Sequence, residues 1–209
     1  MNLNETIWKI ESQLRKPLPG RSAQAKMAHF NRPYSPEIPQ DAKLACVMLL
    51  LYPKDNQTYF VLIERMSTNK NDRHSGQISF PGGKLDQTDL TLLDGALRET
   101  EEEVGINQKD IKSIGSLTDL YIDVSNFHVF PFIGTLDYTP KFVPQPTEVQ
   151  SILEVPLTLL QDPATRQAKN LKIGKGITIK NAPYFNIFGH VVWGATAMML
   201  NEFLEVLKS

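Results

Sequence analysis

Hydrophobic positions along the chain form two patterns, short continuous runs and repeats at helical spacing. Apolar runs at 43–52 and 59–65 predict two β-strands joined by a polar turn. Between residues 90 and 104, Leu93, Leu97 and Val104 recur at helical spacing and predict an amphipathic helix. The same criteria predict further strands at 78–80, 113–122, 127–136, 148–155, 168–173 and 182–188, and helices at 5–15 and 193–207.

Strands outnumber helices in this pattern, and one helix lies between strands. We therefore expect an α+β fold, an α/β/α sandwich in which helices flank a mixed β-sheet. Residues 16–41 are rich in proline and polar side chains, which indicates an arm that wraps the main domain. The expected organisation is an N-terminal helix with a Pro-rich arm in residues 1–42 and the main domain in residues 43–209.

Composition narrows the class of protein. The net charge of −1 gives no basic excess for gripping a polymeric nucleic acid. The longest apolar run, 44–52, is far shorter than the roughly 20 residues of a membrane helix, and the N-terminus has no apolar signal core. The single cysteine, Cys46, excludes an internal disulfide and is expected to be buried and inert. We expect a cytoplasmic protein that binds neither nucleic-acid polymers nor membranes.

Three glutamates on the predicted central helix are candidates for a metal-binding site. Glu99, Glu102 and Glu103 are spaced i, i+3 and i+4, so their carboxylates share one face. Such like charges repel, and the end of a helix disfavours anions. A solvated surface is one explanation. The other is a hard divalent cation, Mg²⁺ or Mn²⁺, which prefers oxygen ligands from carboxylates and substrate phosphates.

The segment "FPGGKLD", residues 80–86, precedes this helix and reads as a Pro-Gly-Gly turn. Its two glycines, Gly82 and Gly83, would let the backbone approach a metal, and we expect a carbonyl at Gly83 to complete the coordination. Arg98 can pair with a neighbouring carboxylate and orient it.

These features together resemble the Nudix box, a Gly-loop-helix-loop motif. Residues 98–106, "RETEEEVGI", match its second half, Arg-Glu-apolar-x-Glu-Glu-x-Gly-apolar, with Thr100 in the first apolar slot. The first half departs from the motif because the glycine-to-arginine spacing is longer. Leu90 also falls where the usual glutamate stands, and Asp86 or Asp89 are the candidates to replace it.

The resemblance implies a mixed-sheet α/β/α fold and hydrolysis of a nucleoside diphosphate linked to another group. By similarity, Glu99, Glu102 and Glu103 would bind the metals, and one of them or a later glutamate would act as base. Glu148 is the candidate outside the box for a base or an additional ligand, with Glu154 as a weaker alternative.

A second resemblance concerns the substrate. Residues 73–83, "RHSGQISFPGG", resemble the segment that marks coenzyme A pyrophosphatases, which implies cleavage of coenzyme A or its acyl derivatives into adenosine 3′,5′-bisphosphate and 4′-phosphopantetheine or its acyl form. The chain departs from that pattern at Met66 and in the longer loop that follows it. Cationic side chains around this loop are expected to bind the phosphates: Arg65, Lys70, Arg73, His74 and Lys84.

Two other functions stay open at this level. One is hydrolysis of ADP-ribose or another nucleotide, and the other is a non-catalytic module that senses a nucleotide. The complete glutamate trio argues against a pure sensor. A homodimer is a possible assembly, because Nudix proteins often dimerise.

Overall fold

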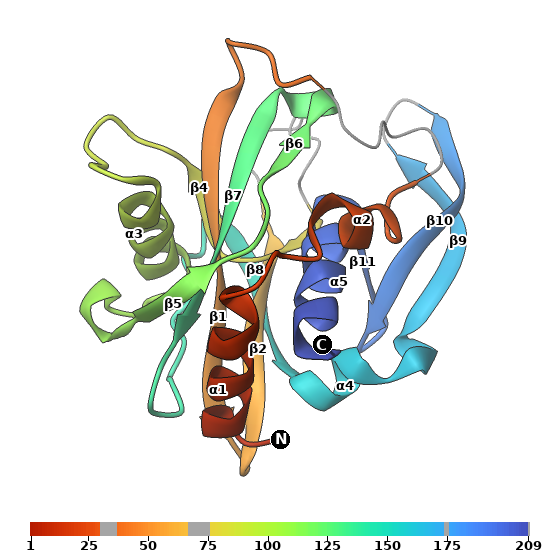
Figure 1. Ribbon diagram of the computed structural model, residues 1–209. Coiled ribbons are helices and arrows are strands. Elements are labelled where there is room, and N and C mark those ends of the chain that lie inside the picture. Colours follow the sequence, from red (N-terminus) through yellow and green to blue (C-terminus); the bar gives the residue numbers. More distant parts are fainter. Residues whose placement is uncertain (30–36, 67–75, 174–175, 209) are drawn as a thin grey trace.

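The computed structural model describes residues 1–29, 37–66, 76–173 and 176–208. A mixed β-sheet lies between helix α3 (Leu92–Val104) on one face and helix α5 (Gly194–Lys208) on the other (Figure 1). The α/β/α sandwich predicted from the sequence is therefore confirmed. A second, three-stranded sheet stands beside α5.

The main sheet has the strand order β3-β2-β1-β7-β5, with β4 on β1, β6 on β7 and β8 on β2. Strands β1 and β7 run parallel, and the other pairs are antiparallel. Its strands are β1 (Lys43–Lys54), β2 (Gln57–Arg65), β3 (Ile78–Ser79), β4 (Gly82–Lys84), β5 (Lys112–Ser116), β6 (Leu120–Ile122), β7 (Phe127–Thr135) and β8 (Val149–Pro156).

The second sheet has the order β11-β10-β9 and is antiparallel. Two of its strands were expected, and β11 and the short helices α2 and α4 were not, because they are too short to show a period. The remaining elements are β9 (Arg166–Ile173), β10 (Ile177–Ile187), β11 (His190–Trp193), α1 (Leu3–Leu14), α2 (Gly20–Ala25), α4 (Leu157–Gln161) and the 3₁₀ turns Gln108–Asp110, Asp123–Ser125 and Pro163–Thr165.

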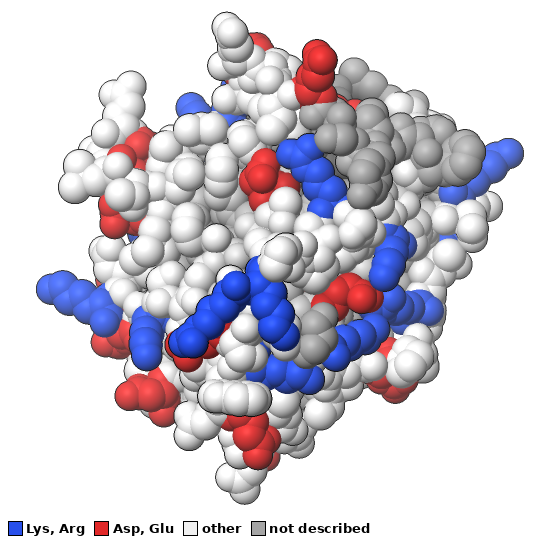
Figure 2. Space-filling model, viewed as in Figure 1, with Lys and Arg blue, Asp and Glu red and all other residues white. Residues whose placement is uncertain are grey.

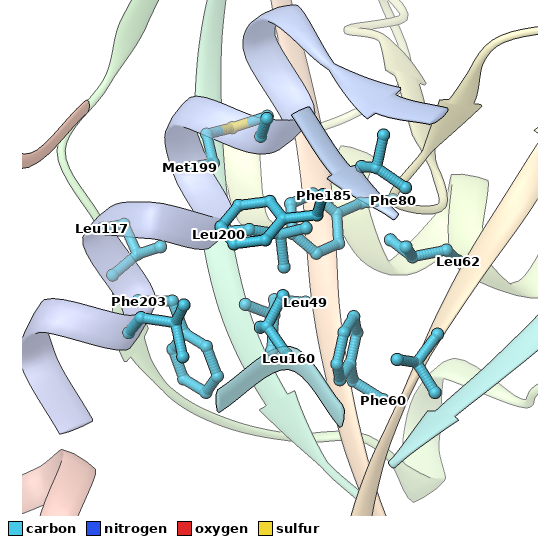
Figure 3. Packing of buried hydrophobic residues seen from close by; sticks show 14 of the residues in the cluster. Leu49, Phe60, Leu62, Phe80, Leu117, Leu160, Phe185, Met199, Leu200 and Phe203 are labelled. Carbon is cyan, nitrogen blue, oxygen red and sulfur yellow. The ribbon is translucent and has the colours of Figure 1, made fainter. Parts of the chain in front are cut away.

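Two apolar cores form because β1 and β2 present side chains to both faces of the sheet. On the α5 side, Leu49 and Phe60 pack against helix residues such as Leu200 and Phe203 (Figure 3). On the α3 side, Met48 and other β1 residues pack under the helix. Residues buried on both faces are the reason that β1 reads as a continuous apolar run.

The N-terminal segment packs on the main domain through α5. Ile10 of α1 is fully buried in the α5-side core. The buried Glu202 of α5 accepts hydrogen bonds from Gly20 N–H, Gln24 Nε2 and the N–H and Oγ1 of Thr118. As far as residue 29, the segment therefore lies against the rest of the chain, while the organisation into residues 1–42 and 43–209 stays a prediction.

The described surface carries both signs of charge. On the face shown in Figure 2, Lys and Arg side chains are interspersed with Asp and Glu. Among the described residues, no helix is long and apolar enough to cross a membrane. The expected cytoplasmic location stays a prediction.

Candidate active site

The two glycines of the "FPGGKLD" segment lie in a strand. The expectation of a Pro-Gly-Gly turn is wrong, because Gly82–Lys84 form β4, whose Gly82 and Gly83 pair with Val47 and Cys46 of β1. Gly82 has a φ of 146°, and a Cβ there would lie 2.3 Å from the carbonyl oxygen of Cys46. Glycine is therefore required for β4 to approach β1 this closely.

Gly83 faces the glutamate helix. A Cβ at this position would lie 2.5 Å from the carboxylate carbon of Glu99. Without a side chain at Gly83, the Glu99 carboxylate can lie directly against the β4 backbone. Contacts between α3 and β4 thus join the two halves of the motif into one site.

Helix α3 starts two residues later than the sequence suggests. Thr91 caps it, accepting a hydrogen bond from Asp94 N–H, while the Asp94 side chain accepts from Thr91 N–H. Thr88 and Asp89 precede the predicted start of the helix and could also cap it, but Thr88 binds Asp86 in the loop and Asp89 binds Arg98. At the other end, Gly105 adopts a left-handed φ of 72° and ends the helix.

Arg98 is the centre of the polar contacts at this site. Its Nη1 donates to Glu99 Oε1 at 2.9 Å and to Glu102 Oε2 at 3.0 Å. Its Nε and Nη2 donate to the two carboxylate oxygens of Asp89, both at 2.9 Å. Nη2 also lies 3.3 Å from the carbonyl oxygen of Lys84 in β4. One guanidinium therefore connects the helix, the preceding loop and the glycine strand.

Of the two candidate aspartates, Asp89 binds Arg98 and Asp86 does not. Asp86 accepts instead from the N–H and hydroxyl of Thr88, and its own N–H donates to Asp89 Oδ2 at 2.8 Å. Leu90, in the slot of the usual glutamate, is 93% exposed. The hydrogen bonds from Arg98 lower the pKa of Asp89, so this carboxylate is ionised at neutral pH.

Glu103 is the most enclosed of the three helix glutamates, with a side chain only 1% exposed. Its Oε2 accepts from Gly82 N–H at 2.8 Å, and its Oε1 lies 3.5 Å from Arg65 Nη1. Burial raises the pKa of Glu103 to about 8, although the Gly82 N–H and Arg65 oppose the rise. Burial likewise raises the pKa of Glu99, against the hydrogen bond from Arg98.

Arg65 reaches the site from the end of β2. Val61 and Ile63 point into the core under α3, so strand alternation places Arg65 on the same face. Its Nη1 also lies 3.5 Å from the carbonyl oxygen of Gly82. The side chain that the sequence suggested as a phosphate ligand thus contacts the buried carboxylate and the glycine strand.

Glu148 is brought to the site by a loop that docks on the end of α3. Val143 N–H and Gln145 N–H donate to the carbonyl oxygens of Val104 and Glu103. The carbonyl oxygen of Glu148 accepts from Met66 N–H, next to Arg65. From this position the charge of Glu148 raises the pKa of both Glu99 and Glu103.

Glu154 lies elsewhere. It binds the hydroxyl of the buried Tyr52 at 3.0 Å and the ammonium of Lys54 at 3.0 Å. It pairs with Val61 in the middle of β2, whereas the strand residue after Glu148 pairs with Arg65. The weaker candidate for a base is therefore a structural partner of Tyr52.

The other residues suggested by the sequence give less information. Lys84 has an exposed side chain and contributes its backbone carbonyl to Arg98. Cys46 is fully buried, as expected, and burial raises the pKa of its thiol to about 12. Lys70, Arg73 and His74 lie outside the described residues.

The donor set suits a hard divalent cation. Among the described residues, no three carboxylate, imidazole or thiol groups already converge as a complete ligand set. Glu99 and Glu102 nevertheless meet at one nitrogen of Arg98, and the buried Glu103 lies on the same helix face. Mg²⁺ is commonly held by one or two carboxylates and completed by substrate phosphates, so such an open arrangement fits it.

The structure combines an α/β/α sandwich with a glutamate-bearing helix packed against a glycine strand. This is the arrangement that the resemblance to the Nudix box implies. The chain matches the NUDIX domain over residues 42–173, which is more than half of its length. It belongs to the NUDIX family.

Curated relatives share this family. A protein of Arabidopsis thaliana named "Nudix hydrolase 15, mitochondrial" is 31% identical over 162 residues, covering 76% of this chain and 56% of the relative. The "Uncharacterized Nudix hydrolase NudL" of Pectobacterium atrosepticum is 38% identical over 97 residues, covering 46% of this chain and 50% of the relative. The NudL protein of Photorhabdus laumondii is 29% identical, and the match covers 78% of this chain and 84% of the relative. The chain thus spans about half the length of two of these relatives.

Solved structures show weaker similarity. The NUDIX domain of Shewanella oneidensis NrtR complexed with ADP ribose has a TM-score of 0.46 and 22% identity, covering 62% of this chain and 83% of that domain. A C. elegans Ap4A hydrolase binary complex has a TM-score of 0.45 and 16% identity, covering 55% and 80%.

Proposed function

We propose that this protein is a metal-dependent pyrophosphohydrolase that cleaves the diphosphate of coenzyme A or its acyl derivatives. The products would be adenosine 3′,5′-bisphosphate and 4′-phosphopantetheine or its acyl form. One observation carries the hydrolase assignment: Arg98 joins Glu99 and Glu102 beside the glycine strand, while Glu103 is buried in the same site. The substrate assignment rests on the "RHSGQISFPGG" segment.

Each residue has a definable task in this reaction. Glu99, Glu102 and Glu103 would hold Mg²⁺ or Mn²⁺, with the Gly83 carbonyl as a further ligand. When bound, the metal neutralises the diphosphate oxygens and lowers the pKa of the attacking water. Water attacks one phosphorus, the bond from that phosphorus to the bridging oxygen breaks, and the second phosphate leaves with that oxygen. Glu148 would accept the water proton.

Cationic residues would bind the substrate. Arg65 is the last residue of β2 and contacts the buried Glu103. Together with Lys84 and the loop cations Lys70, Arg73 and His74, it would contact the diphosphate and the 3′-phosphate of coenzyme A. A sensor without catalysis is less consistent with three carboxylates kept on one helix face, since their mutual repulsion destabilises the metal-free protein.

A substrate panel with Mg²⁺ or Mn²⁺ tests the proposal. Coenzyme A, acyl coenzyme A, ADP-ribose and nucleoside triphosphates are compared for the wild type, Glu102→Gln and the control Glu101→Gln. Glu101 binds Gln108 outside the site, so its variant should retain activity. We expect adenosine 3′,5′-bisphosphate from the wild type and the control, and a loss of at least about 100-fold in Glu102→Gln.

Other results would redirect the assignment. Faster turnover of ADP-ribose than of coenzyme A would contradict the assignment of coenzyme A as the substrate, but the assignment of the protein as a hydrolase would stand. No turnover of any diphosphate, together with retained nucleotide binding, would support the sensor instead.

A further inference from the structure

Asp89 has no task in the reaction above, yet its carboxylate accepts two hydrogen bonds from Arg98. We infer that Asp89 is a positioning residue, which acts through Arg98 to fix the orientation of Glu99 and Glu102 and thereby the metal site. This inference rests on the proposed metal-dependent function but not on the identity of the substrate.

The geometry of the guanidinium carries the inference. Arg98 Nε and Nη2 form one edge of a planar group, and they donate to Asp89 Oδ1 and Oδ2, both at 2.9 Å. Two parallel hydrogen bonds to one carboxylate fix both the place and the plane of the guanidinium. Nη1, the remaining nitrogen, then has a fixed position, and this is the atom that holds Glu99 and Glu102.

Asp89 is itself held firmly enough to serve as this anchor. Its side chain is 4% exposed, and its Oδ2 also accepts from Asp86 N–H at 2.8 Å. Its own N–H donates to the carbonyl oxygen of Asp86 at 3.2 Å, which closes a tight turn before α3. Asp89 is therefore held by its own loop in addition to its bonds from Arg98.

Helix α3 leaves room for the anchor. A Cβ at Gly95 would lie 2.9 Å from Asp89 Oδ2, so the carboxylate occupies space that a larger helix residue would fill. Leu90, one residue further along, points into solvent. The longer loop of this chain thus supplies the carboxylate for Arg98 from the position before the usual glutamate slot.

Mn²⁺ binding without substrate, measured by calorimetry on the full chain, tests this role. We expect Asp89→Asn to weaken Mn²⁺ binding by about 10- to 100-fold, the range typical of residues that support metal ligands. We also expect kcat to fall by at least about 10-fold, with KM changed less than about threefold. The control is Asp94→Asn, the same change in the capping box of α3, which should lower the melting temperature but leave Mn²⁺ binding intact.

A double-mutant cycle with Arg98→Gln separates positioning from general stabilisation. If Asp89 acts through Arg98, Asp89→Asn will cause no additional loss of Mn²⁺ affinity in the Arg98→Gln background. An equal loss of Mn²⁺ affinity in both backgrounds would overturn the inference about Asp89 and leave the proposed function standing. A lower melting temperature of Asp89→Asn with unchanged Mn²⁺ affinity would do the same. A wild type that binds no Mn²⁺ would overturn the proposed function and this inference with it.

Discussion

Glu103 should make the metal-free protein less stable at neutral pH. Its pKa is raised from 4.5 in the unfolded chain to about 8 in the folded protein. Because the folded value is the higher one, the folded state gains stability from the bound proton below about pH 4.5. This gain is lost as pH rises from there towards 8.

The size of this effect follows from the pKa values. Each pKa unit corresponds to about 1.4 kcal/mol, so at pH 7 the buried carboxyl costs up to about 3 kcal/mol relative to an acidic solution. Glu103→Gln removes this cost and keeps an oxygen for Gly82 N–H. The amide N–H₂ of the new side chain also faces the guanidinium of Arg65, and two donors cannot bond each other. We expect this to offset roughly 1 kcal/mol of the gain in stability. The variant should therefore be more stable than the wild type by about 1–2 kcal/mol at pH 7.

Urea unfolding in the presence of a chelator, from about pH 4.5 to pH 8, measures this difference. The stability advantage of Glu103→Gln should disappear at the acidic end, and Glu101→Gln should follow the wild type at every pH. Adding Mn²⁺ should stabilise the wild type and the control more than Glu103→Gln. A Glu103→Gln variant that is less stable than the wild type at pH 7 would refute the reasoning.

Three further predictions follow from single contacts. Gly83→Ala places a Cβ 2.5 Å from the Glu99 carboxylate and should lower kcat by at least about 10-fold in a folded protein, as judged by circular dichroism. Glu148→Gln should lower kcat by about 100-fold with unchanged Mn²⁺ affinity in calorimetry if Glu148 is the base, whereas a parallel loss of affinity would make it a ligand. Glu202→Ala removes an acceptor of four hydrogen bonds and should cost roughly 3 kcal/mol in urea unfolding. Its kcat at low temperature should stay unchanged, and a selective loss of activity would contradict a purely structural role.

Much of the fold follows from the pattern of apolar positions alone. Strands β1 and β2 are long apolar runs, and helices α3 and α5 repeat their apolar positions often enough to identify them. The wrong details have local causes. Gly82–Lys84 read as a turn because Pro-Gly-Gly favours turns, but pairing with β1 determines their conformation. The start of α3 was misplaced because Thr88, Asp89 and Thr91 are all suitable caps, and only hydrogen bonding distinguishes them.

The site was predictable where its residues lie on one helix. Spacing alone places Glu99, Glu102 and Glu103 on one face, but it says nothing about contacts between elements far apart in the chain. The ion pair of Arg65 with Glu103 joins β2 to α3, and the approach of Glu148 depends on backbone bonds from the loop 143–148. The choice between two aspartates also required the path of the loop, since both are close to Arg98 in sequence.

The charges around Arg98 differ from those of a solvated helix surface. Three carboxylates, those of Asp89, Glu99 and Glu102, contact a single guanidinium, so this group of side chains carries a net charge of −2 when ionised. The side chain of Asp89 is 4% exposed and that of Glu99 is 14% exposed, so water screens only part of the repulsion. A solvated surface would leave such carboxylates in water. Here all three are fixed by hydrogen bonds and two of them, Asp89 and Glu99, are largely buried, whereas Glu102 is exposed. A cation of charge +2 would neutralise this arrangement, and a single proton would relieve it only in part.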